Sequence, residues 1–246
     1  MTTNERLRTA IHAAGLTIDQ LGEDVGVDPK TVERWISTDR VPHRAHRQAV
    51  ATALGKDDVF LWPTTLSAAR TKTASEAEFV AIHANRGAVP PGTWDALLHQ
   101  PKESIDILAY AASFLYDTIP EFTRLLTDRA NEGIRVRLLF GDPGSQAVLR
   151  RGEEERIGDS LASRTALTWK YIAPLTTTPG LDARKHGTTL YDSVFRYDDE
   201  MLVNLHSYGA AGAQCPYIHL HRVAGGRMFA HYMEAFERVW EGGEPV

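Results

Sequence analysis

Two short helical segments joined by a glycine-containing turn constrain the fold of this chain more than any other feature. Thr17, a residue type that caps helices, precedes the first segment, and Gly26 ends it. Asp28-Pro29 opens the second segment with a capping residue and a proline at the first helical position. The apolar positions at helical spacing are Ile18, Leu21 and Val25 in the first segment and Val32, Trp35 and Ile36 in the second. Two helices connected by so short a turn form a helix-turn-helix unit.

Three more helices are predicted around this unit. One ends at Gly15, and a later one starts at Pro42 and ends at Gly55. Residues 59–62 are apolar and predict a short fifth helix that covers the end of the fourth. The inward positions of the flanking helices are Leu7, Ile11, Val50 and Leu54. We therefore expect an all-α domain over residues 1–63.

The helix-turn-helix run resembles the phage-repressor-like family of transcription regulators, also called Cro-like or XRE. The positions that carry the resemblance are the small residue Gly22, the turn Gly26-Val27, the buried Val32 and the pair Arg34-Trp35. The resemblance covers about residues 4–62. It implies a domain that binds double-stranded DNA, with the second helix of the unit in the major groove. The alternative is a small helical interaction module with the same packing.

The distribution of charge favours DNA binding by this domain. The whole chain has 27 basic and 32 acidic residues, so it is not a protein coated in nucleic acid. Residues 30–47, however, hold five Lys or Arg against two Asp or Glu. We predict base contacts from Asp28, Lys30, Thr31, Glu33 and Arg34, backbone contacts from Arg40, His43, Arg44 and Arg47, and Thr17 at the same surface. The alternative is a solvated charged face, with Glu33 in a surface ion pair.

The remainder of the chain alternates strands and helices after a polar linker. Residues 64–77 are small and polar and predict a flexible or loosely helical linker. Strands are expected at residues 79–82, 104–110, 134–140, 166–171, 189–197, 201–208 and 216–223, and helices near residues 94–98, 122–129, 145–164 and 229–240. The strand–helix–strand order within residues 104–140 implies parallel pairing. The predicted class is α + α/β, with the sheet domain over residues 78–246.

The order of elements in this sheet domain resembles half of a phospholipase D superfamily unit. Residues 133–139 match the strand that reads Gly-Val-X-Val-Arg-X-Leu in that family. A hairpin in the family then carries His-X-Lys followed by Asp, and the aligned positions here hold Tyr191, Ser193 and Asp198. A register starting at His186 does not restore the motif either. The resemblance implies the fold without the nucleophilic His and the phosphate-binding Lys, so we expect no catalysis of that type and no cofactor.

Polar side chains near the sheet edge predict a ligand-binding groove instead. They are Arg184, Lys185, His186, Tyr191, Ser193, Asn204, His206, His219 and His221. Residues 184–186 offer consecutive donors for an anionic group, with an exposed loop as the alternative. Three imidazoles on one face (His206, His219 and His221) suit either zinc or a set of hydrogen-bonded groove histidines. We favour the second, and expect no metal, because no nearby carboxylate spacing completes a known site. The lone Cys215 is expected to be a small buried residue.

Together these patterns predict a cytoplasmic, sequence-specific transcription regulator. No apolar run approaches the roughly 20 residues that span a bilayer, and the N-terminus lacks the apolar core of a signal peptide. The helical domain of residues 1–63, called the head below, would bind a palindromic operator. The sheet domain of residues 78–246 would form a homodimer and sense a small anionic or nucleotide-like effector. We expect Tyr191, His206 and His219 near the two-fold axis. The alternatives are a phosphodiesterase-type hydrolase that uses the head for targeting, and an interaction adaptor whose head binds no DNA.

Overall fold

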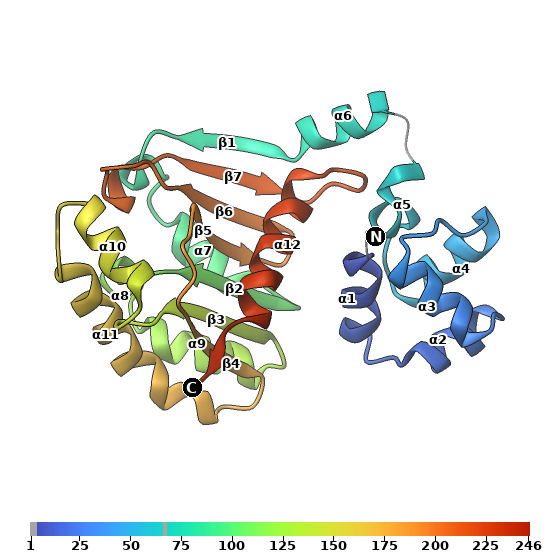
Figure 1. Cartoon of the computed structure of the whole chain (residues 1–246), viewed down its shortest axis with the longest axis horizontal. Helices are drawn as coiled ribbons and strands as arrows, with labels where there is room; N and C mark the ends of the chain where they lie inside the picture. The colour runs from blue at the N-terminus through green and yellow to red at the C-terminus, as the bar shows by residue number, and fades with distance from the viewer. Residues whose placement is uncertain (1–3, 66–67) are drawn as a thin grey trace. The chain divides into compact units, whose positions relative to one another are not determined.

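The chain has a helical part followed by a sheet, as the computed structural model shows for residues 4–65 and 68–246 (Figure 1). Its contacts divide it into two compact units, one of residues 1–78 with 222–230 and one of residues 79–221 with 231–246. The predicted class, α + α/β, is confirmed. The first unit includes the predicted linker, whose residues 66 and 67 lie outside the described residues. Around them the chain forms a 3₁₀ turn, Pro63–Thr65, and helix α6, Ala68–Ala77.

The five predicted helices of the head are confirmed. They are α1 (Glu5–Ala13), α2 (Ile18–Val25), α3 (Pro29–Ser37), α4 (Arg44–Ala53) and α5 (Asp58–Leu61). Their common core is formed by the apolar positions at helical spacing, and it adds Leu61 and Trp62 from the last turn. The rings of Trp35 and Trp62 meet edge to face, with centroids 6.3 Å apart. The head therefore has a hydrophobic core of its own.

One eight-stranded sheet organises the second unit. In chain order its strands are β1 (Phe79–His83), β2 (Ser104–Ala109), β3 (Arg135–Gly141), β4 (Leu181–His186), β5 (Asp192–Tyr197), β6 (Glu200–Leu205), β7 (Tyr217–His221) and β8 (Glu244–Pro245). The spatial order is β1-β7-β6-β5-β2-β3-β4-β8. The predicted parallel pairing of β2 with β3 is confirmed, and β4 continues the parallel part, while all other neighbours are antiparallel. The carboxyl ends of β2, β3 and β4 consequently lie at the same end of the sheet.

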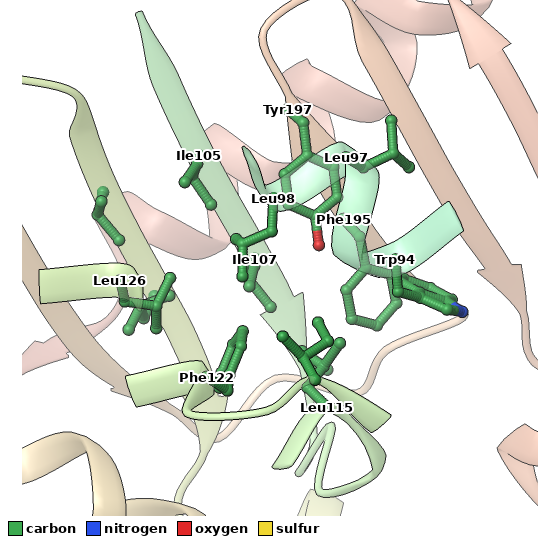
Figure 2. Close-up of a cluster of buried hydrophobic side chains, with 14 of the residues drawn as sticks. Trp94, Leu97, Leu98, Ile105, Ile107, Leu115, Phe122, Leu126, Phe195 and Tyr197 are labelled. Carbon is green, nitrogen blue, oxygen red and sulfur yellow. The ribbon is translucent and has the colours of Figure 1, made fainter. Parts of the chain in front are cut away.

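Helices cover both faces of this sheet. They are α7 (Thr93–His99), α8 (Phe114–Thr118), α9 (Phe122–Asn131), α10 (Gln146–Glu154), α11 (Ser160–Ile172) and α12 (Met228–Glu241), with 3₁₀ turns at Arg86–Ala88, Ala173–Thr177 and Gly212–Gln214. The first three pack on one face, where Trp94, Leu98 and Phe122 meet Ile107 and Phe195 in the main core (Figure 2). Helix α12 lies across the other face (Figure 1). Among the residues that the structure describes, no helix combines the length and apolar character of a membrane span.

The strand predicted at residues 166–171 is wrong. These residues belong to helix α11, because the buried positions Leu161, Thr165, Trp169 and Ile172 recur at helical spacing. The β-branched and aromatic residues of this segment suggested a strand. The third parallel strand is instead β4. It includes residues 184–186, for which the sequence pattern predicts either an anion site or an exposed loop.

A buried carboxylate joins the central strands. Asp106 on β2 is fully buried, and the register places Arg137 of β3 and Arg196 of β5 on either side of it. Arg137 Nε donates to Asp106 Oδ1 at 2.6 Å, and Arg196 Nη1 donates to Oδ2 at 2.8 Å. Arg137 also makes two 2.8 Å hydrogen bonds to Glu237 of α12 and lies over the Phe236 ring. Burial alone would raise the pKa of Asp106, but the two guanidinium groups reverse this and lower that pKa to about 2.

We predict that Asp106→Asn lowers the free energy of unfolding at pH 7 by about 3–5 kcal/mol, because it leaves two buried guanidinium groups without their shared anion. Urea unfolding measures the difference, and Asp95→Asn, at an exposed carboxylate, is the control. The folded pKa lies below the unfolded value, so the contribution of Asp106 is complete above about pH 4 and is lost as the pH falls towards 2. Equal stability of Asp106→Asn and wild type at pH 7 would contradict this account.

Candidate DNA-binding face and ligand pocket

The turn between α2 and α3 is fixed by backbone geometry. Gly26 adopts a left-handed conformation (φ 69°), and Val27 N–H donates to the carbonyl of Gly22 at 2.8 Å. The Asp28 carboxylate then accepts the N–H of Lys30 at 2.9 Å and so caps α3. A Cβ on Gly22 would lie only 2.9 Å from the Val27 carbonyl oxygen. This close approach requires glycine and sets the angle between the two helices.

We predict that Gly22→Ala loosens the head by about 1–3 kcal/mol, because the added methyl group pushes the turn away from α2. Hydrogen–deuterium exchange with mass spectrometry should show faster exchange of the amides of α2 and α3 and unchanged exchange in β2 and β3. Gly144→Ala is the matched control, since a Cβ there has no heavy atom nearer than 3.9 Å. Unchanged protection of α2 and α3 in Gly22→Ala would contradict the role given to this contact.

Four basic side chains on and after α3 are available to a ligand. Lys30 and Arg34 lie on α3, and Arg40 and Arg44 follow it; all four are exposed. None of them makes a hydrogen bond or ion pair with another residue in the described ranges 4–65 and 68–246. Among the other residues predicted to contact DNA, Glu33 and His43 are exposed and Thr31 is half-buried. In the described ranges, no acidic side chain forms an ion pair with any of these four basic side chains.

Three of the residues predicted to contact DNA are engaged within the head. Thr17 forms a capping box with Gln20, in which each side chain accepts the N–H of the other residue at 3.2 and 2.8 Å. The carboxylate of Asp28 caps α3. Arg47 is half-buried; its Nε lies 3.3 Å from Asp58 and its Nη1 donates to the Pro42 carbonyl at 3.2 Å. These side chains support the fold of the head, and Arg47 in particular fastens α4 to α5.

A cavity of about 360 Å³ opens at the carboxyl end of β2. The chain from Ala109 to Phe114 forms one wall, and Ala112 there has a left-handed backbone (φ 49°) that side chains rarely adopt. The facing wall comes from β5, β6 and β7 and the turn after β6, through Ser193, Phe195, Asn204, His206, Gly212 and Tyr217. Its charged lining residues are Arg86, Asp117, Glu155 and Arg164. The size suits a small organic ligand.

Ser193 and His206 form a polar pair in this cavity. Ser193 Oγ lies 3.0 Å from His206 Nε2, and His206 Nδ1 lies 3.3 Å from the carbonyl oxygen of Leu190. Since a carbonyl only accepts, Nδ1 carries the proton, and Nε2 accepts from the serine hydroxyl. The ring stacks on Tyr110, with centroids 6.0 Å apart. Burial, reinforced by the positive charge of Arg151, lowers the pKa of His206 to about 4, so this imidazole is neutral at pH 7.

The other predicted ligand residues on β4 do not converge. Strand alternation turns Arg184 toward α12, where its guanidinium lies 4.4 Å from the Trp240 ring centroid and donates to the Trp240 carbonyl. Lys185 points to the opposite face and lies over Trp169 of α11. His186 is buried, and its Nε2 lies 3.2 Å from the carbonyl oxygen of Ala109. The prediction of three neighbouring donors for one anion is therefore wrong, because the segment is a strand.

The predicted histidine cluster is also separated. His219 Nε2 and His221 Nδ1 lie 2.6 and 2.8 Å from the two carboxylate oxygens of Glu200. His219 pairs with Leu202 in the register, and His206 follows Leu202 by four residues, just after β6 ends. The backbone positions of His206 and His219 are therefore about 13 Å apart along the strand direction. Within residues 4–65 and 68–246, no three His, Cys, Asp or Glu side chains are arranged to hold a metal ion. Tyr191 is 82% exposed and lines no part of the cavity.

Sequence reasoning thus found three of the polar residues of the cavity, Ser193, Asn204 and His206, and missed the rest. Arg86 and Arg164 come from distant segments, and no local pattern connects them to the hairpin. Tyr110 carried a usable signal, because it follows a buried parallel strand whose carboxyl end is where α/β sheets bind ligands. Cys215 is buried, as expected.

No protein-family model matches the chain, and no curated protein matches it. Several solved structures resemble it distantly, among them the following two. TrmBL2, an archaeal chromatin protein that shows a novel mode of DNA binding, is 16% identical with a TM-score of 0.44, and the match covers 70% of this chain and 56% of TrmBL2. Nuc from Salmonella typhimurium, a phospholipase D family member, is 15% identical with a TM-score of 0.43, and the match covers 68% of this chain and 96% of Nuc. The match therefore spans little more than half of the TrmBL2 chain, and neither similarity identifies a site.

Proposed function

We propose that this chain is a cytoplasmic, sequence-specific DNA-binding regulator of transcription. The observation that carries the proposal is the unneutralised surface of Lys30, Arg34, Arg40 and Arg44 on a helix-turn-helix unit with fixed geometry. In such units the N-terminal and outward residues of the second helix reach base edges, here Lys30, Arg34 and Glu33. Arg40 and Arg44 are placed to contact phosphates, which position the protein without selecting a sequence.

The sheet unit is proposed to regulate rather than to cleave phosphodiesters. At the positions of the phospholipase D motif, Tyr191 points to solvent and Ser193 binds His206. Asp198, which does match the motif, accepts the backbone N–H groups of Lys102, Glu103 and Ser104 at 2.6, 3.0 and 2.8 Å. Its carboxylate is thus used to hold the start of β2. Tyrosine and serine do not replace a nucleophilic His and a phosphate-binding Lys.

The cavity at the carboxyl end of β2 is the proposed effector site. Two guanidinium groups, from Arg86 and Arg164, line it together with the hydrogen-bonding side chains Ser193 and Asn204. The aromatic ring of Phe114 lies against Arg86, with 4.4 Å between the guanidinium carbon and the ring centroid. The lining also holds Asp117 and Glu155, so its two positive and two negative charges balance. A small planar molecule whose anionic group faces an arginine, such as one related to a nucleotide, suits this cavity.

The sheet unit is also the proposed dimerisation surface. Tyr191 and Tyr208 flank the β5–β6 hairpin and are 82% and 87% exposed, which makes them the most exposed of the large hydrophobic residues in the described part of the chain. Tyrosine contributes large contact area at interfaces. We place the two-fold axis beside the β5–β6 hairpin, near Tyr191, His206 and His219. A dimer would present two heads to two half-sites about 34–36 Å apart, as a palindromic operator requires.

For DNA contact, we predict that Arg34→Ala and Arg44→Ala differ in kind. Arg34→Ala relaxes preference at one base pair, at a cost of about 1–3 kcal/mol, because a base-edge contact is lost. Arg44→Ala weakens binding to all duplexes alike and lowers the slope of log affinity against log salt by about 1. Fluorescence anisotropy with a selected duplex and its single-base variants measures both, with Arg8→Ala on α1 as control. Altered sequence preference in Arg44→Ala, combined with no effect of Arg34→Ala, would show that the docking is wrong.

For assembly, we predict that light scattering of the full chain gives a mass of about twice 27.3 kDa. Tyr191→Lys should shift the equilibrium toward the monomer, because it places two like charges beside the two-fold axis. Tyr171→Lys, at an exposed tyrosine of α11, is the control and should remain dimeric. A wild-type chain that is monomeric at all concentrations, or a dimer insensitive to Tyr191→Lys, would overturn the proposed interface.

A further inference from the structure

We propose that Ser193 and His206 form a nucleophile–base pair that accepts the acyl group of a small carboxylic ester in the cavity at the carboxyl end of β2. This activity is distinct from phospholipase D chemistry, which uses a histidine nucleophile, and it does not depend on DNA binding by the head. It rests on the geometry of the pair and on the cavity around it.

The three groups needed for an activated serine are in line. The hydroxyl of Ser193 donates to His206 Nε2 at 3.0 Å, and the opposite ring nitrogen donates to the Leu190 carbonyl at 3.3 Å. This is the order of nucleophile, base and orienting group that activates serine in hydrolases. The Leu190 carbonyl selects the tautomer that leaves Nε2 free to take the serine proton. The stacked Tyr110 ring, itself held by the Leu190 N–H at 2.8 Å, fixes the plane of the imidazole.

The surroundings of His206 determine its charge state and its strength as a base. His206 is surrounded by buried groups and faces Arg151, which is held by Glu155 at 2.7 Å. The imidazole is therefore neutral at physiological pH and its Nε2 can accept a proton, while the pKa of about 4 makes it a weaker base than an unshifted histidine. A serine–histidine contact on an open surface would have neither this fixed tautomer nor this fixed charge.

The cavity supplies what an acyl transfer needs beside the pair. Ser193 is 6% exposed and lines the cavity of about 360 Å³, so the hydroxyl is shielded from bulk water but reachable by a small ligand. Phe114 and Phe195 form an apolar wall for the acyl chain. Arg86 and Arg164 line the same space, together with Asp117 and Glu155. A guanidinium group turned toward the attacked carbonyl would stabilise the oxygen that becomes negative.

The step balances within these groups. Ser193 Oγ bonds to the ester carbonyl carbon while its proton moves to His206 Nε2. The bond from that carbon to the alcohol oxygen breaks, and the alcohol leaves with the proton from Nε2. Water then attacks the acyl-serine, passes one proton through His206 back to Ser193 Oγ, and releases the carboxylic acid. No oxidant, reductant or metal takes part.

An alkyl fluorophosphonate tests the pair without knowledge of the natural ester. It forms a phosphorus–oxygen bond to an activated serine and loses fluoride, and intact-mass spectrometry of the full chain counts the adducts. We expect one adduct per chain, mapped to Ser193, and none in Ser193→Ala. Ser163→Ala removes an exposed serine of α11 that does not line the cavity and should label like the wild type. His206→Gln should slow labelling by about 10²–10⁴-fold, because it removes the base.

Hydrolysis of p-nitrophenyl acetate gives the second readout, with p-nitrophenol release expected from wild type and Ser163→Ala and lost in Ser193→Ala. Circular dichroism of each variant shows whether it folds, and a known serine esterase confirms that the probe is active. Absence of an adduct on the folded wild-type chain, an adduct elsewhere, or an unchanged labelling rate in His206→Gln would overturn the proposal and leave a purely structural hydrogen bond. DNA binding by the same samples reports separately on the proposed regulator.

Discussion

The central strands of the sheet depend on one buried anion. Asp106 lies in register between Arg137 and Arg196 on its two neighbouring strands, and Arg137 continues the network to Glu237 of α12. A buried charge is costly unless its hydrogen bonds are complete, so this network favours a single register of β2, β3 and β5. The same strands deliver Ala109 at the end of β2 and Ser193 near the start of β5 to one cavity. The cavity at the carboxyl end of β2 therefore depends on charged residues in the middle of these strands.

The head is held together by local interactions instead. Backbone caps at Thr17, Gly26 and Asp28 fix where each helix begins or ends, and the close contact of Gly22 with the Val27 carbonyl fixes how α2 and α3 meet. Neither these helix caps nor the contact between Gly22 and Val27 uses the side chain of a basic residue. Lys30, Arg34, Arg40 and Arg44 therefore remain free of intrachain partners in the described part of the head, as a surface for phosphates and base edges requires.

This difference explains what could be predicted from the sequence. The head's helices follow from capping residues and apolar spacing, both of which act within a few residues. Most strands of the sheet were predictable for the same reason. Residues 166–171 were assigned to a strand because Thr168 and Trp169 favour one locally, while tertiary burial on one helical face determines α11. The parallel strand β4 was missed because its polar side chains gave no apolar pattern. Arg184 and Lys185 instead pack on rings of two helices, α12 and α11, that are distant in the sequence.

The candidate site was predictable only where it is local. Ser193 and His206 lie on one hairpin, so their proximity follows from strand register, and Asn204 lies on the same hairpin. Arg86 and Arg164 reach the cavity from segments separated by many residues, which a single sequence does not reveal. Glu200, which binds His219 and His221, was overlooked because its pairing with His221 depends on the β6–β7 register.

Selection of binding sites from random duplex DNA tests the central claim most directly, because it requires no knowledge of the operator. The full chain, incubated with the pool at low salt and through several rounds, should enrich one motif made of two inverted half-sites with centres about 34–36 Å apart. A chain carrying both Lys30→Ala and Arg34→Ala should not enrich that motif. Failure of the wild-type chain to enrich any sequence would contradict the proposal that this protein is a sequence-specific DNA-binding regulator.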